Sequence, residues 1–213
     1  MAHLALRKRI IATARAINDA GLNPGKSGNV SARVDGGMLI TPTGMGYAAL
    51  RASDIVHMKI DGRVPGRQRK PSSEWRFHRD IYHARADVGA IVHVHSAHAT
   101  ALACTRRGIP AFHYMVAVAG GDSIRCAPYA TFGTQRLSDL AVKALRGRQA
   151  CLLANHGMIA CGETVESALA LATEVEFLAQ QYAISLQIGG TVVLSGAEMR
   201  TVLEKFKSYG KQE

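Results

Sequence analysis

Two histidines, His93 and His95, are separated by one valine in segment 90–96, which is otherwise mostly apolar and β-branched. Side chains two positions apart on a β-strand point to the same face, so both imidazoles are expected on one side of a strand. Neutral imidazole is a good ligand for zinc and similar first-row metals, and such a pair supplies two of the three protein ligands that an open catalytic site needs. Because this spacing also occurs by chance on half-solvated strands, the pair needs support from elsewhere in the chain.

A carboxylate and a third histidine offer that support. Glu74 lies upstream in Pro71-Ser-Ser-Glu-Trp75, and His156 lies downstream in Ala154-Asn-His-Gly157, after the apolar run 150–153. Each stands beside the end of an expected helix or strand, where a side chain can be presented to a site. With these two groups available, metal binding becomes the favoured interpretation of the histidine pair.

Three short segments of small and polar residues are suited to bind an anion. Residues 21–30 and 41–46 are glycine-bearing loops beside expected strands; glycines such as Gly28 let backbone amides converge, and Asn29 adds a side-chain donor. The dipeptide Ser72-Ser73 opens an expected helix, whose free amides and hydroxyls can bind phosphate. Each segment also has an ordinary explanation as a loop or a helix N-cap, and the first is not a P-loop. A phosphate pocket is therefore one of two interpretations that the pattern allows.

The composition is typical of a globular chain, and we expect a single domain over residues 1–213. The chain has 47% hydrophobic and 20% charged residues. No apolar run approaches the roughly 20 residues of a membrane span, and the first residues lack a signal-peptide pattern, so we expect a cytoplasmic protein without a membrane segment. The four cysteines have no C-x-x-C spacing and are expected to be small buried residues.

The chain is strongly basic, with 26 Lys and Arg against 16 Asp and Glu and a formal net charge of +10. The basic residues are spread along the chain, and few aromatic residues interleave with them, even in the densest patch, residues 63–70. This argues against nucleic-acid binding, which needs basic residues combined with stacking side chains. Attraction of an anionic metabolite such as a sugar phosphate explains the charge more simply.

Hydrophobic periodicity predicts many strands joined by short turns, with helices interspersed irregularly. The expected helices are 4–20, 47–52, 71–85, 98–105, 134–145, 165–188 and 197–206. The expected strands are 30–34, 38–41, 55–60, 90–96, 112–118, 124–129, 150–153, 158–161 and 192–194. Because this order is not the strict alternation of a parallel α/β protein, we predict a largely antiparallel sheet covered by helices.

Seven motifs occur in a fixed order along the chain, and the set is more specific than any one of them. They are Gly28-Asn-Val-Ser31, Thr41-Pro-Thr-Gly44, Pro71-Ser-Ser-Glu-Trp75, His93-x-His95, His113-Tyr114, Ala127-Pro-Tyr-Ala-Thr-Phe-Gly133 and Asn155-His-Gly157. In this order they resemble the class II aldolase and adducin-head family over nearly the whole chain. The resemblance implies an α/β protein with three α/β/α layers and a mainly antiparallel central sheet. It also implies a cyclic homotetramer with active sites between subunits.

The resemblance further implies one zinc ion per subunit, held by three histidines and, in the empty site, by a glutamate. The implied metal ligands are Glu74, His93, His95 and His156. Glu74 would also be the acid-base group during turnover. The implied phosphate-binding residues are Gly28, which shapes its loop, and Asn29, Thr43, Gly44, Ser72 and Ser73. One departure is Asn155, which stands where close relatives often carry another histidine, so hydrogen bonding beside the metal ligand can differ.

Three aromatic residues complete the implied site. Tyr114, reaching in from a neighbouring subunit, would handle the proton on the aldehyde oxygen. Tyr209 and Phe132 match residues that line and cover the site, and Tyr209 is assigned with the catalytic groups. The implied reaction is reversible cleavage of L-fuculose 1-phosphate, or a related ketose 1-phosphate, to dihydroxyacetone phosphate and a short aldehyde such as L-lactaldehyde.

Several alternatives stay open. The related substrates 5-deoxyribulose 1-phosphate and methylthioribulose 1-phosphate fit the same motifs. An L-ribulose 5-phosphate 4-epimerase is disfavoured, because such relatives usually carry Ser-Ser-Asp-Thr where this chain has Ser-Ser-Glu-Trp. A non-catalytic structural module like the adducin head does not need an open metal site. Lys26 and Lys70 are candidates for a rival Schiff-base mechanism, but nothing indicates an apolar, pKa-lowering pocket around either.

Overall fold

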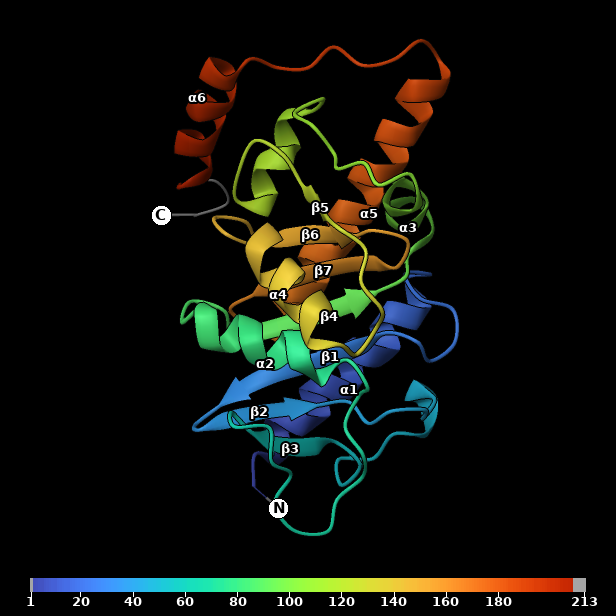
Figure 1. Cartoon of the computed structure of the whole chain (residues 1–213), viewed down its shortest axis with the longest axis vertical. Coiled ribbons are helices and arrows are strands. Elements are labelled where there is room, and N and C mark those ends of the chain that lie inside the picture. The colour runs from blue at the N-terminus through green and yellow to red at the C-terminus, as the bar shows by residue number, and fades with distance from the viewer. Residues whose placement is uncertain (1, 209–213) are drawn as a thin grey trace.

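The protein, described here by a computed structural model, is defined over residues 2–208 (Figure 1). Its strands within this range are β1 (Asn29–Val34), β2 (Gly37–Ile40), β3 (Val56–Lys59), β4 (Ala90–Val94), β5 (Arg125–Ala127), β6 (Ala150–Leu153) and β7 (Gly157–Gly162). They form one sheet in the order β3-β2-β1-β4-β7-β6-β5. Neighbouring strands are antiparallel except β5 and β6, which are parallel, so the prediction of a mainly antiparallel sheet is confirmed.

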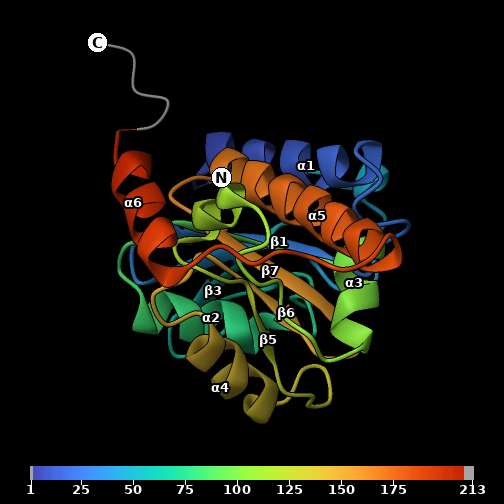
Figure 2. The same ribbon diagram turned by 90° about the horizontal axis from the view of Figure 1, so that it is seen from above.

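Helices cover both faces of this sheet. The helices are α1 (Leu4–Asp19), α2 (Trp75–Ala84), α3 (Ala97–Cys104), α4 (Gln135–Ala144), α5 (Val165–Gln187) and α6 (Gly196–Phe206), with 3₁₀ turns η1 (Tyr47–Ala49) and η2 (Tyr114–Ala119). Figure 2 shows α1 and α5 on one face and α2 and α4 on the other, while α6 lies to one side. The three-layer α/β/α arrangement expected from the family resemblance is therefore present.

Strand β4 lies in the middle of the sheet and is buried on both faces. Val92 and Val94 pack into the apolar cluster beneath α1 and α5, and Ile91 packs into the cluster beneath α2 and α4. Because side chains alternate along a strand, His93 shares the face of Ile91, where its ring meets Phe77 of α2 edge-on. The alternation of valines and histidines thus separates a packing face from a functional face.

Helix α5 is the longest helix of the described chain, and its sequence explains both its start and its position. Thr164 caps the helix by accepting a hydrogen bond from the backbone N–H of Ser167, whose hydroxyl accepts one from the N–H of Thr164. Ala168, Ala172 and Ala179 are fully buried at helical spacing. These small side chains let α5 lie close against β4 and β7 and close one side of the core.

Two predicted strands are wrong. Most of segment 112–118 lies in η2 (Tyr114–Ala119) instead, because the side chain of His113 accepts a hydrogen bond from the N–H of Met115 and Gly120, at φ 85°, ends the turn. Segment 192–194 is irregular: Val192 is 89% exposed, and Leu194 makes one backbone bond, to Ala111, without an adjacent strand. Both segments are rich in apolar and β-branched residues, but neither has a sheet edge to pair with.

Two smaller expectations also need correction. The helix expected from position 71 begins only at Trp75, after a turn that contains Ser72. Cys151 and Cys161 are buried as predicted, whereas Cys104 is exposed and Cys126 is half-buried. Within residues 2–208 no helix is long and apolar enough to cross a membrane.

Candidate active site

Four side chains converge at the end of β4. Glu74, His93, His95 and His156 each offer one ligand atom, and these atoms all lie within 4.8 Å of one another. Glu74 directly precedes α2, His93 belongs to β4, His95 directly follows it, and His156 lies in the turn between β6 and β7. The antiparallel pairing of β4 with β7 brings this turn beside the histidine pair, although the two segments are about sixty positions apart in the chain.

The turn that presents His156 depends on two special backbone positions. The N–H of His156 bonds to the carbonyl of Leu153 at 3.0 Å, and Asn155 adopts a left-handed conformation at φ 55°, which asparagine tolerates better than most residues. A Cβ atom on Gly157 would lie 2.6 Å from Cδ2 of His95. Glycine is therefore needed at position 157 so that His95 can approach the turn.

A hydrogen bond fixes the orientation and tautomer of His93. Its Nδ1 lies 2.8 Å from the carbonyl oxygen of Met158, and because a carbonyl only accepts, Nδ1 must carry the proton. In the neutral ring Nε2 then holds a lone pair, and it faces Oε2 of Glu74 at 3.1 Å and Nε2 of His95 at 3.0 Å. Such a backbone bond is the usual device that aims a histidine at a metal.

Burial and mutual interaction shift the pKa values of these groups. Burial raises the pKa of Glu74, but His93 and His156 lower it by more, so the net pKa lies well below its usual range and the side chain is ionised. Burial lowers the pKa of His93, but the Glu74 carboxylate raises it to a net value above normal. Burial and the neighbouring histidines lower the pKa of His95 to about 4, so this ring is neutral at physiological pH.

The donor set fits a metal cation. Oε1 of Glu74 is buried without a hydrogen-bond partner, although Nε2 of His156 lies 3.0 Å away. A buried, unpaired carboxylate oxygen is costly unless a cation or donor compensates for it. Three imidazole nitrogens and one carboxylate oxygen around a common point are the ligands that zinc and similar metals prefer. Glu74, His93, His95 and His156 are thus able to hold such an ion.

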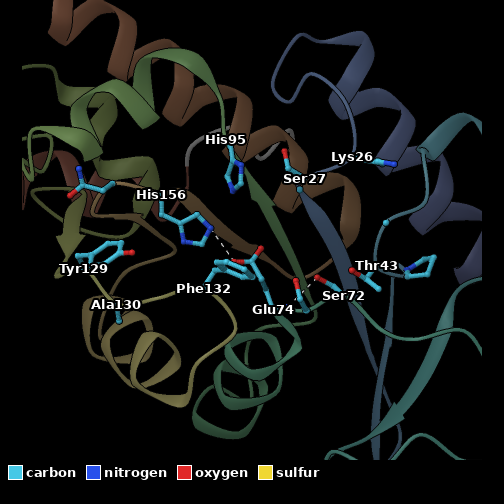
Figure 3. A pocket seen from close by; sticks show the side chains of 15 residues that line it. Lys26, Ser27, Thr43, Ser72, Glu74, His95, Tyr129, Ala130, Phe132 and His156 are labelled. Carbon is cyan, nitrogen blue, oxygen red and sulfur yellow. Dashed lines mark hydrogen bonds and ion pairs between the residues drawn. The ribbon is translucent and has the colours of Figure 1, made fainter.

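A pocket of about 360 Å³ opens onto this cluster. Its lining includes Lys26, Ser27, Gly28, Thr43, Gly44, Ser72, Ser73, Glu74, His95, Tyr129, Phe132 and His156. Figure 3 shows Thr43 and Ser72 on one side of Glu74 and Tyr129 on the other, with His156 directed at the carboxylate. Asn29 and His93 do not line the pocket; both contact Glu74 from the interior. The structure therefore gathers at one pocket nearly all the residues expected to bind phosphate and metal.

Backbone hydrogen bonds join residues 41–43 to residues 70–72 on this rim. The N–H of Thr43 bonds to the carbonyl of Lys70, and the N–H of Ser72 bonds to the carbonyl of Thr41. Gly44 has a φ of 72°, in the left-handed region that favours glycine. These contacts place the hydroxyls of Thr43 and Ser72 and the start of α2 around one concave rim beside Glu74.

The remaining predicted residues are placed differently. Phe132 lines the pocket and is 65% exposed. Tyr114 is exposed and lies on a separate hollow of about 600 Å³ between η2 and α6, so within its own chain it is not part of the Glu74 pocket. Tyr209 lies outside the described residues. Asn155 lines the pocket but uses its side chain to bond Arg106 and the carbonyl of Cys104.

Sequence reasoning missed a buried polar layer behind Glu74. Ser31, His78 and Tyr82 are nearly inaccessible to solvent and hydrogen-bond to one another. A signal was present, because Glu74, His78 and Tyr82 are spaced four apart and therefore share one face of a helix that also carries the apolar core contacts.

The fold and the pocket together define a three-layer α/β/α protein with a candidate metal centre. Residues 8–183 match the family model described as the Class II Aldolase and Adducin N-terminal domain, and the chain belongs to this family. Class II aldolases are metal-dependent, in agreement with the Glu74 cluster.

The relatives are similar over almost their whole length. The chain is 56% identical over 207 residues to the 5-methylthioribulose-1-phosphate/5-deoxyribulose-1-phosphate aldolase of Rhodospirillum rubrum, covering 97% of this chain and 93% of that protein. It is 53% identical to the L-fuculose phosphate aldolase of Escherichia coli strain K12, covering 96% and 95%. A solved L-fuculose 1-phosphate aldolase superimposes with a TM-score of 0.94 at 42% identity, covering 97% and 98%. The chain is therefore an enzyme, a lyase of the class II aldolase type, and not a non-catalytic module.

Proposed function

We propose that the protein is a zinc-dependent aldolase that reversibly cleaves a ketose 1-phosphate to dihydroxyacetone phosphate and a short aldehyde. One observation carries this proposal. The buried Glu74, with one unpaired oxygen, lies among three histidines at the inner end of a pocket whose rim is formed by small polar loops. A metal centre beside an anion-binding rim suits a substrate that presents a carbonyl and a phosphate.

The proposed metal ligands are His93, His95 and His156, with Glu74 as a fourth ligand before substrate binds. Three neutral imidazoles leave a bound zinc ion its full formal charge. When bound there, zinc would act as a Lewis acid that stabilises the negative charge developing on the substrate oxygens.

Glu74 is the proposed acid-base group. In the condensation direction its carboxylate takes a proton from the hydroxymethyl carbon of dihydroxyacetone phosphate, and in cleavage it returns a proton to that carbon. Glu74 is ionised, as a base must be, and its Oε1 makes no protein hydrogen bond apart from the approach of His156 Nε2 at 3.0 Å.

The substrate phosphate is proposed to bind at the polar rim. The proposed residues are Gly28, Asn29, Thr43, Gly44, Ser72 and Ser73. The α2 N-terminus adds free backbone amides, which favour an anion. Asn29 is a special case, because its side chain faces Glu74, so a direct phosphate contact requires a rearrangement of that amide.

Tyr114 is proposed to act from a neighbouring subunit, on the oxygen that becomes the aldehyde. Its exposure and its distance from the pocket of its own chain agree with such a role, which requires the predicted homotetramer. Phe132 and Tyr209 are proposed to line the aldehyde side. Tyr114→Phe should lower cleavage at least 10-fold more than it lowers proton exchange, since only cleavage requires that the substrate hydroxyl at that oxygen give up its proton. Equal loss of both rates contradicts this role.

Two substrate classes compete for the aldehyde half. L-fuculose 1-phosphate is supported by the 53% identical relative, and 5-deoxyribulose 1-phosphate or methylthioribulose 1-phosphate by the 56% identical relative. All of them release dihydroxyacetone phosphate, so the Glu74 cluster and the rim serve each in the same way. Discrimination has to come from the residues that face the aldehyde half.

The test is a coupled assay for dihydroxyacetone phosphate with each of the three sugar phosphates. We expect cleavage of at least one substrate, loss of activity on chelation and recovery when zinc is restored. Cleavage that persists after complete metal removal contradicts the metal role. Failure to cleave any of the three, with zinc bound, contradicts the aldolase assignment and makes epimerisation of L-ribulose 5-phosphate the next reaction to measure.

A further inference from the structure

A continuous chain of buried polar side chains runs from Tyr82 to the carboxylate of Glu74. The hydroxyl of Tyr82 lies 2.7 Å from Oγ of Ser31, which lies 2.7 Å from Nδ1 of His78. Nε2 of His78 lies 2.5 Å from Oδ1 of Asn29, and Nδ2 of Asn29 lies 3.0 Å from Oε2 of Glu74. All five residues are at most 5% exposed.

Strand and helix periodicity together build this chain. Asn29 and Ser31 are two apart on β1 and share a face, while Glu74, His78 and Tyr82 are four apart along α2. The two rows interlock, so each bond passes from one element to the other. Ser31 and His78, in the middle of the row, are fully buried, so water cannot substitute for a missing partner there.

The direction of every hydrogen bond in this row of side chains follows from the carboxylate of Glu74 at its end. An ionised carboxylate only accepts, so Asn29 must turn its NH₂ group to Glu74 and its Oδ1 to His78. An amide oxygen also only accepts, so His78 must carry its proton on Nε2. Its Nδ1 then accepts from the Ser31 hydroxyl, whose oxygen accepts from the hydroxyl of Tyr82. All donors point towards Glu74, and bonds aligned in this way strengthen one another.

Packing holds the row in its middle, at His78, and at its Tyr82 end. The ring of Phe77 stacks on His78 with centroids 4.7 Å apart and an interplanar angle of 26°. The guanidinium of Arg33, the next residue on the same face of β1, lies 4.8 Å from the ring centroid of Tyr82 and bonds to its carbonyl. The row therefore presents one fixed donor, the Asn29 amide, to Oε2 of Glu74.

We propose that His78 is a positioning residue which, through Asn29, holds Oε2 of Glu74 and thereby leaves Oε1 as the oxygen that exchanges a proton with the substrate. This inference rests on the proposed role of Glu74 as the acid-base group. It explains why a histidine without access to the pocket is buried so close to it. It also agrees with the different surroundings of the two carboxylate oxygens, since Oε2 accepts from the Asn29 amide while Oε1 has only the imidazole of His156 nearby.

Two amide substitutions distinguish the roles of the two ring nitrogens of His78. His78→Gln can place an NH₂ group where Nε2 lies and keep the bond to Asn29, whereas His78→Asn can only reach the position of Nδ1. We expect His78→Asn to lower kcat for deuterium exchange into dihydroxyacetone phosphate 10- to 100-fold, with KM and zinc content within about 3-fold of wild type. His78→Gln should stay within about 3-fold in kcat.

Equal losses in both variants, or wild-type kcat in His78→Asn, overturn the proposal. If His78→Asn does not fold, Ser31→Ala provides the second test. It removes the hydroxyl donor that fixes the His78 tautomer and leaves the histidine side chain itself unchanged. We expect Ser31→Ala to lower kcat for exchange at least 3-fold at unchanged KM. A Ser31→Ala enzyme with wild-type kcat also overturns the proposal.

Neutron diffraction of the zinc-loaded, deuterium-exchanged protein gives a readout that does not depend on activity. We expect deuterium on Nε2 of His78 and none on Nδ1, with the Asn29 ND₂ group facing Glu74. The opposite tautomer, or a reversed Asn29 amide, refutes the positioning role even if the enzyme is active. Absence of exchange in the wild type, with these deuterium positions observed, instead refutes the acid-base role of Glu74 and the proton-exchanging role of Oε1.

Discussion

The two faces of the central sheet bury very different side chains. Towards α1 and α5 the central strands β1, β4, β6 and β7 bury apolar residues, among them Val30, Val92, Leu152 and Met158. Towards α2 the same strands bury Asn29, Ser31 and His93, and the helix adds Glu74, His78 and Tyr82. One face is a packing surface, and the other carries a polar row that ends at the candidate metal centre.

This difference shows where the fold accepts polar burial. An unpaired buried polar group destabilises a protein by roughly 1–3 kcal/mol, and more when charged. On the α2 face almost every such group is paired with a neighbour, and the exception, Oε1 of Glu74, faces the pocket. Substitutions on the α2 face should therefore change activity or metal binding, whereas substitutions on the face towards α1 and α5 should change the free energy of unfolding.

The largest effect is expected at Glu74. Glu74→Gln keeps the shape of the side chain but removes its basicity, so we expect deuterium exchange into dihydroxyacetone phosphate to fall about 10²- to 10⁴-fold. The three histidines should still bind zinc, which a metal analysis of the purified variant checks. Glu163→Gln, at an exposed glutamate, is the matched control and should leave the rate unchanged. Exchange at the wild-type rate in Glu74→Gln rules out Glu74 as the base.

A smaller effect is expected at Gly157, which touches the functional face without offering a ligand. The added Cβ of Gly157→Ala would lie 2.5 Å from the carbonyl oxygen of Val94 and 2.6 Å from Cδ2 of His95. Because His95 must move, zinc affinity measured against a competing chelator should fall about 10- to 100-fold. Gly196→Ala, where the nearest atom to the added Cβ is a terminal guanidinium nitrogen of Arg200 at 3.6 Å, should not change it. Equal affinity in both variants means that His95 does not need its observed position.

The functional face was partly readable from the sequence. The spacing of His93 and His95 sufficed to place both on one face, because strand alternation is a local property. The proximity of Glu74 and His156 depended on pairing between β4 and β7 and on the start of α2, which periodicity does not specify. Their grouping was therefore inferred from resemblance, and the structure supplies the distances.

The errors in the sequence analysis have physical causes. Segments 112–118 and 192–194 contain the residues that strands favour, yet a strand also needs a partner edge, and the sequence of one segment does not show whether such an edge exists. His78 was overlooked because a histidine on an amphipathic helix is usually a surface residue. Only the burial of α2 against β1 turns it into part of the polar row.

A substitution on the packing face should lower the stability of the protein without changing its chemistry. Val92→Ala removes two buried methyl groups beneath α5, next to His93 in sequence but on the opposite face, and should lower the free energy of unfolding by about 2 kcal/mol. Urea titration of the zinc-loaded protein measures this loss. Activity per folded molecule should remain within about 3-fold of wild type. A 10-fold loss of zinc affinity in Val92→Ala would show that the two faces are not independent.

The smallest effect is expected for an ion pair on the packing side. Arg9 of α1 makes a two-bond contact with Glu166 of α5, and this hydrogen-bonded partner lowers the pKa of Glu166 from 4.5 to about 2. Both side chains are about half exposed, so the pair should contribute only ~0.5 kcal/mol at neutral pH.

The contribution of this pair to stability should depend on pH in a defined direction. A carboxylate with a depressed pKa contributes stability above its unfolded pKa near 4.5 and loses that contribution as the pH falls through about 2. The difference in unfolding free energy between wild type and Arg9→Gln should therefore be constant from pH 7 to 5 and vanish towards pH 2. Glu166→Gln should show the same difference at pH 7, since it breaks the same pair. A difference above 2 kcal/mol at pH 7 would mean that electrostatics, and not apolar packing alone, stabilises the α1 and α5 face.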